Sequence, residues 1–120
     1  MHRQIKNNNN LKTKQNMKTI KLSSVFRKLG KFKNRVENME SPSSYDKVPN
    51  QFILHYKNGT LYQSYRSIIA VRFNDGTICL SELHEYSLTT RKYAKKFCDG
   101  KNTKERRERL EDGRYLKIVE

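Results

Sequence analysis

Two turn signals, each lying between runs of alternating apolar and polar residues, constrain the fold of this chain more than any other feature. The signals are the dipeptides Asn58-Gly59 and Asp75-Gly76, and the alternating runs occupy residues 51–57, 60–65, 68–74 and 77–82. Asn, Asp and Gly favour two-residue hairpin loops because they tolerate positive φ angles. The sequence therefore predicts two successive hairpins, which form an antiparallel β-meander of about four strands.

The second hairpin also predicts its strand register. A two-residue loop at Asp75-Gly76 would place Phe73 opposite Ile78 and Val71 opposite Leu80. These four residues would share one largely apolar face of the sheet, while the other face would be more polar. That division is typical of an antiparallel sheet that packs on a core with one face.

Two helices and a last strand are predicted after the meander. Ser87 is suited to cap a helix from about Leu88 to Cys98, and Gly100 lies where a helix C-cap is expected. A short charged helix should follow over residues 103–110, and residues 114–119 alternate as a C-terminal strand does. The predicted fold class is α+β, with one or two helices covering the antiparallel sheet.

The segment before the meander predicts a basic amphipathic helix over residues 22–40. Its apolar residues recur at spacings of three and four, and they are Leu22, Val25, Leu29, Phe32, Val36 and Met39. Gly30 would weaken the middle of this helix by about 1 kcal/mol relative to Ala. Residues 41–46 would be a linker to an α+β domain at residues 47–120. The stripe would dock on that domain or pair with a second copy as a homodimer; a membrane surface or a partner groove is the alternative.

Residues 1–21 predict a disordered basic tail, because they consist largely of Lys, Asn, Gln and Thr without a periodic apolar face. Translation could begin at Met1 or at Met17. The chain has a formal net charge of +14, and residues 1–40 hold 11 basic and 2 acidic side chains. A basic arm of this kind favours a polyanionic target.

Several classes of protein are not supported by the sequence. Cys79 and Cys98 are the only cysteines, and they do not have the spacing of a zinc site. The motifs of P-loop proteins, zinc proteases and serine hydrolases are missing, so we expect a non-enzymatic protein without a metal or cofactor. No apolar stretch has the length of about 20 residues that a membrane span needs.

The candidate nucleic-acid-binding residues are cations and hydroxyls. They are Arg27, Lys28, Lys31, Lys33 and Arg35 on the remaining surface of the helix predicted over residues 22–40, and Ser87, Thr89, Thr90, Arg91, Lys92, Lys95 and Lys96 around the helix predicted from Leu88. The hydroxyls and free N–H groups at the start of that helix could hold a phosphate. Alternatively, the hydroxyls only cap the helix and the cations face water. Tyr56, Tyr62, Tyr65 and Tyr86 supply rings that could stack on unpaired bases.

A family likeness rests on short motifs between about residues 52 and 98. These are Ser64-Tyr65, Ile69-Ala70, Asp75-Gly76 and Tyr86-Ser87-Leu88-Thr89-Thr90, followed by Tyr93 and Phe97. The pattern resembles small uncharacterised phage proteins. The resemblance implies a phage origin and action in the host cytoplasm, and it supplies no catalytic residue.

Two functions remain in competition at this point. The first is a phage accessory protein that binds DNA or RNA by its phosphate backbone, through the arm and the start of the predicted helix. The second is a protein-interaction module that inhibits or redirects a host or defence protein.

Overall fold

The computed structural model describes residues 16–120. The disordered tail was predicted for residues 1–21. Residues 1–15 lie outside the described residues, and the prediction is wrong for residues 18–21, which form a strand. The choice between Met1 and Met17 as the start stays a prediction. In chain order the elements are β1 (Lys18–Lys21), α2 (Leu22–Leu29), β2 (Phe32–Glu40), β3 (Lys47–Tyr56), β4 (Gly59–Ser64), β5 (Ser67–Phe73), β6 (Ile78–Leu80), the 3-10 helix η1 (Glu82–Glu85), α3 (Leu88–Phe97), α4 (Thr103–Glu111) and β7 (Leu116–Val119).

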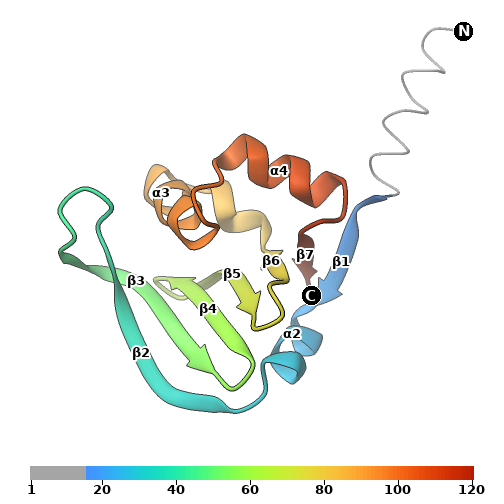
Figure 1. The fold of residues 1–120 in the computed structure, drawn as a ribbon, viewed down its shortest axis with the longest axis horizontal. Coiled ribbons are helices and arrows are strands. Elements are labelled where there is room, and N and C mark those ends of the chain that lie inside the picture. The colour runs from blue at the N-terminus through green and yellow to red at the C-terminus, as the bar shows by residue number, and fades with distance from the viewer. Residues whose placement is uncertain (1–15) are drawn as a thin grey trace, which may run out of the picture.

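All seven strands form one mixed sheet in the order β1-β7-β6-β5-β4-β3-β2 (Figure 1). Strand β7 pairs in parallel with both β6 and β1, and the other pairs are antiparallel. The predicted meander of about four strands plus a C-terminal strand is therefore wrong. Two strands were missed because β1 and β2 lie in segments that predicted a tail and a helix.

The predicted helix over residues 22–40 is wrong in its second half. The helix α2 ends at Leu29, and Gly30 follows it with a φ of +74°. Phe32 and Val36 lie four residues apart. This spacing puts two side chains on the same face of a helix, but it also puts them on the same face of a strand, where side chains alternate. Pairing of β2 with β3 satisfies the backbone of this segment, so the strand forms. Residues 41–46 are the loop that joins β2 to β3 within one sheet.

The predicted register of the second hairpin is wrong by one residue. The loop has three residues, 74–76, because the Phe73 N–H donates to the Thr77 carbonyl at 2.9 Å and Gly76 adopts a φ of +92°. Glycine in this position closes the common three-residue hairpin loop. Val71 consequently pairs with Cys79, and the side chains of β6 are turned to the face opposite to the predicted one.

The first hairpin turns at residues 57–58, and Gly59 is the first residue of β4, opposite Tyr56. Gly59 is needed there for space, since a Cβ atom would collide with the carbonyl oxygen of Arg72 on β5. The sequence predicted the presence of this turn correctly but placed its loop one residue late.

Each face of the sheet carries a core. On one face, α3 and α4 cover a cluster that includes Tyr62, Ile69 and Leu80 (Figure 1). On the other face, Val25 and Leu29 of α2 are fully buried in a second cluster around β4, β5 and β6. The apolar stripe of α2 therefore docks on the sheet, so these two side chains are not available to pair with a second copy.

The C-terminal elements match the sequence prediction more closely. Ser87 caps α3 by accepting a hydrogen bond from the Thr90 N–H, as predicted. The helix α4 begins with a capping box of Asn102 and Glu105. Strand β7 lies between β6 and β1. None of the helices in the part of the chain that the structure describes is long and apolar enough to cross a membrane.

Candidate nucleic-acid interface

The connection from α2 to β2 is held against the turn between β3 and β4. The Lys57 N–H donates to the Lys31 carbonyl at 2.8 Å, and the Asn58 N–H donates to the Leu29 carbonyl at 2.9 Å. The Asn58 amide Nδ2 also donates to the Lys28 carbonyl at 3.0 Å. These backbone contacts fix Lys31 and Lys57 side by side although they are far apart in the sequence.

A shallow pocket of about 350 Å³ opens at this junction, and we call it the basic pocket. It is lined by Lys31, Phe32, Lys33, Asn34 and Lys57. All three lysines are exposed, and none of them forms an ion pair within residues 16–120. Three unpaired ammonium groups around one hollow attract an anion, because no neighbouring carboxylate offsets their charge.

Three aromatic rings adjoin the basic pocket, and we call them the aromatic trio. The Tyr56 ring centroid lies 5.3 Å from that of Phe32 and 6.1 Å from that of Phe26. The rings are tilted by 54° and 57°, a favourable arrangement for aromatic pairs. Phe26 is exposed and Phe32 and Tyr56 are half-buried, so the trio is part of the surface.

The surface continues along β2 and β3 as a strip of partly exposed apolar residues, of which Leu54 and Tyr56 also pack against the second core. Val36 is 53% exposed and pairs with Leu54, and Phe52 lies two residues further along the same face of β3. Figure 1 shows that β2 and β3 extend away from α2, at the end of the sheet opposite to β1. We call Phe32, Val36, Phe52, Leu54 and Tyr56 the open strip.

The five cations predicted on one helix are divided between α2, β2 and the connection that joins them. Arg27 is exposed on α2 without an ion-pair partner in the described chain, whereas Lys28 binds Asp75 at 3.2 Å and lies 4.4 Å from the centre of the Phe73 ring. A hydrogen bond from the Thr77 backbone N–H, assisted by Lys28, lowers the pKa of Asp75 to about 2. Arg35 binds Glu37 at 2.6 Å. Lys31 and Lys33 are the two that line the basic pocket.

The second predicted set lies on the other face of the sheet, at α3. The Ser87 hydroxyl donates to Thr90 Oγ1 at 2.9 Å and accepts from the Thr90 N–H, so both side chains are engaged in capping. Thr90 is buried, and Thr89 is exposed. The exposed cations of this helix are Arg91, Lys92, Lys95 and Lys96, of which Lys96 donates to the Glu40 carbonyl. These residues form a second basic surface that is separate from the basic pocket.

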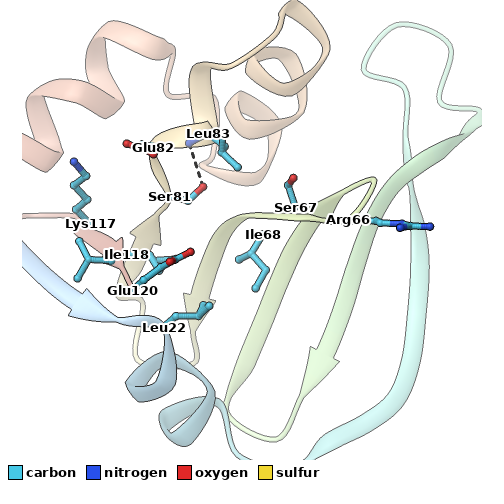
Figure 2. Close-up of a pocket in the computed structure, with 11 residues that line it drawn as sticks. Leu22, Arg66, Ser67, Ile68, Ser81, Glu82, Leu83, Lys117, Ile118 and Glu120 are labelled. Carbon is cyan, nitrogen blue, oxygen red and sulfur yellow. Dashed lines mark hydrogen bonds between the residues drawn. The ribbon is translucent and has the colours of Figure 1, made fainter.

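Two further hollows lie near the start of β5, where Ser67 lines both of them. One of about 600 Å³ lies at the start of α3, where Tyr65 and Tyr86 are exposed rings. The other, of about 570 Å³, is drawn in Figure 2. Its lining includes two cations, Arg66 and Lys117, and two carboxylates, Glu82 and Glu120. Balanced charge makes this hollow a poorer site for a polyanion than the basic pocket.

Tyr62 is fully buried and donates a hydrogen bond to Gln51, so it cannot stack on a base. His84 is buried as well, and its Nδ1 accepts a hydrogen bond from Arg106. His55 lies elsewhere, on β3, and its Nε2 is 2.7 Å from Glu37. No group of three His, Cys, Asp or Glu side chains suited to a metal occurs among residues 16–120.

Sequence reasoning missed Phe26, Phe32 and Lys57 as members of this surface. Phe32 was assigned to the buried stripe of a helix, and Phe26 lies outside that stripe. Lys57 was placed at the end of a predicted strand, without a binding role. Their common position depends on the contact between the α2–β2 connection and the β3–β4 turn, which no local pattern encodes.

The fold and this surface define a small protein with a seven-stranded mixed sheet and a basic, aromatic surface on one face. The chain belongs to a family of unknown function (DUF8033), whose match covers residues 29–113. No curated protein and no solved structure matches the chain.

Proposed function

We propose that this protein is a non-enzymatic nucleic-acid-binding protein whose basic pocket contacts the phosphate backbone. The observation that carries the proposal is the convergence of Lys31, Lys33 and Lys57 on one hollow without a carboxylate partner in the described chain. Arg27 supports it from α2. The phage origin and the action in the host cytoplasm that the resemblance implies are part of the same proposal.

The chemistry of the pocket suits phosphodiester groups. Each lysine that neutralises a phosphate releases condensed counterions, which gives binding free energy that depends on salt but not on base sequence. Residues 1–15 add Arg3, Lys6, Lys12 and Lys14 and contain no acidic residue. This arm would raise affinity for any polyanion, whereas the pocket fixes where the backbone lies.

The test is fluorescence anisotropy of a labelled oligonucleotide between 50 and 200 mM salt. The triple variant Lys31→Gln, Lys33→Gln, Lys57→Gln should lose affinity, and the logarithmic salt slope should fall by about 2, at about 0.7 for each single-strand phosphate contact. A matched variant removes the same charge from α3 through Arg91→Gln, Lys92→Gln and Lys95→Gln. Equal losses in both variants would assign binding to net charge rather than to the basic pocket, and no loss in either would contradict the proposal.

A protein-interaction module is the second candidate, and the outer edge of β2 favours it. Within residues 16–120 this nine-residue strand pairs only with β3, and the loop after it exposes Tyr45 by 74%. An unpaired strand edge can accept a strand from a partner. A partner that stays bound in nuclease-treated lysate, and that is lost with Tyr45→Ser, would favour this function.

A further inference from the structure

We infer that the aromatic trio and the open strip form a site for single-stranded nucleic acid, in which unpaired bases stack on the rings while the lysines of the basic pocket hold the phosphates. The inference rests on the proposed function, because it names the class of nucleic acid that the same surface would select.

The first step is that the rings are partly exposed to solvent. Phe26 is 37% exposed, and Phe32 and Tyr56 are half-buried beside it. Strand pairing places Val36 and Leu54 next to Phe32 and Tyr56, so several partly exposed apolar residues are neighbours, unlike the single exposed apolar residues that are normal for proteins. Burial under a ligand would remove this surface from water.

The second step concerns the charge at the border of that surface. Phe32 lines the basic pocket together with Lys31, Lys33 and Lys57, so ring faces and unpaired ammonium groups are neighbours. A second copy of the chain placed here in a symmetric dimer would set like charges against one another, which costs free energy. A polyanion instead gains from each of these groups, so charge complementarity favours a nucleic acid as the occupant.

The third step distinguishes a single strand from a duplex. In a duplex the base faces are stacked on one another and only the backbone and the groove edges can be contacted. Aromatic rings next to phosphate-binding cations become useful when the bases are unpaired, because each base then has a free face to stack. Asn34 also lines the pocket, and its side-chain amide can donate to or accept from a base edge.

The surface is built on rigid elements, which suits a stacking site. Tyr56 ends β3 and pairs with Phe32 in β2, and the next turn is fixed by the bond from the Lys57 N–H to the Lys31 carbonyl. From Tyr56 to Phe52 the strip runs along β3 for about 13 Å, taking a rise of about 3.3 Å per residue. The rings therefore keep their spacing from the lysines without a ligand.

The test uses the full chain with a single tryptophan as a reporter. The native sequence has no Trp, so Phe26→Trp gives one indole in the aromatic trio. A single-stranded oligonucleotide should quench its fluorescence, whereas an abasic oligonucleotide of the same length should bind by charge without quenching. The single strand should also bind at least about tenfold more tightly than its duplex.

Replacing the aromatic rings should lower the affinity for a single strand and leave the electrostatic contribution of the lysines in place. In the native background, Phe26→Leu with Phe32→Leu keeps apolar bulk but loses stacking, which is worth about 1–3 kcal/mol per base, or roughly five- to 150-fold in affinity. Phe26→Tyr keeps a ring and should restore most of the single-strand affinity. Binding of the abasic strand should fall much less than binding of the intact single strand, and circular dichroism of each variant checks that it remains folded.

The outcomes separate the inference from the proposed function. Equal binding of single strand and duplex without quenching, but with loss in the lysine triple variant, overturns the inference and leaves the proposed function standing. Failure to bind any oligonucleotide overturns both. Quenching or a spectral shift that depends on protein concentration alone, or that occurs only with anionic vesicles, overturns the inference in favour of a second copy or a membrane surface.

Discussion

The two faces of the sheet are closed by helices of different length and different anchoring. The face under α3 and α4 is covered by two capped helices, and Arg106 of α4 is fully buried there. The face under α2 has one eight-residue helix without a side-chain N-cap, and it leaves much of the open strip partly exposed. Both faces carry a buried core, but only the second leaves a group of apolar and cationic side chains partly exposed beside its helix.

Arg106 should give the largest effect if the α3/α4 face carries the stability. Its guanidinium donates to Nδ1 and the carbonyl of His84, to the Lys101 carbonyl and to Thr103 Oγ1, at 2.7–3.1 Å. Arg106→Ala leaves these acceptors without their donor and opens a cavity, so the free energy of unfolding should fall by about 4 kcal/mol. Urea denaturation measures the loss.

The matched control lies on the other face, where Arg27→Ala should change the free energy of unfolding by less than about 0.5 kcal/mol. If Arg106→Ala proves too unstable to purify, Thr103→Val removes a single acceptor and should cost about 1 kcal/mol. Equal stabilities of the Arg106 and Arg27 variants would contradict the assignment of stability to the α3/α4 face.

His84 should make this same face sensitive to acid. Burial, and secondarily the positive charge of Arg106, lowers the pKa of His84 from 6.5 to about 4. Between these values the unfolded chain binds a proton that the folded chain does not, so stability falls as the pH falls. The loss begins near pH 6.5, is complete near pH 4 and amounts to about 3 kcal/mol.

Carboxylates with lowered pKa values, such as Glu37 and Asp112, also lose stabilising contacts in acid, so the contribution of the His84 imidazole must be measured separately. His84→Asn offers a neutral oxygen to Arg106 without titrating in this range. Urea denaturation at pH 7.0 and 4.5 should show a smaller acid loss in the variant than in the native protein. Identical losses would mean that His84 is accessible to protons in the folded chain.

Local signals in the sequence predicted the elements of the α3/α4 face better than those of the α2 face. Ser87 predicted the start of α3 as an N-cap residue, and in the structure it caps that helix. In contrast, β1 contains one apolar residue, Ile20, and is formed by parallel pairing with β7 almost 100 residues away. No local sequence pattern predicts this pairing, because the backbone hydrogen bonds of β1 form only when β7, which is distant in the sequence, folds against it.

The candidate site was also predicted only in those parts that depend on local sequence. The sequence identified Lys31 and Lys33 as exposed cations, but it assigned them to a helix on which Phe32 would be buried. Asn74 shows why the hairpin register also escaped prediction, since it joins Asp75 and Gly76 in the loop instead of pairing within β5. The loop length at an Asp-Gly sequence is set by neighbouring contacts, here the bond from the Asn74 N–H to the Asn58 carbonyl on the adjacent turn.

The smallest change in the free energy of unfolding is expected for a substitution on the open strip. It tests the contrast between exposed and buried positions of the sheet. Val36→Thr exchanges two β-branched residues of similar shape at a position that is 53% exposed. The hydroxyl meets water, so the free energy of unfolding should change by less than about 0.5 kcal/mol. The same exchange at Val71, which is fully buried in β5, should cost about 1–3 kcal/mol because its hydroxyl is desolvated. Thermal denaturation of the two variants decides the matter: a large loss from Val36→Thr would mean that the strip is covered in solution.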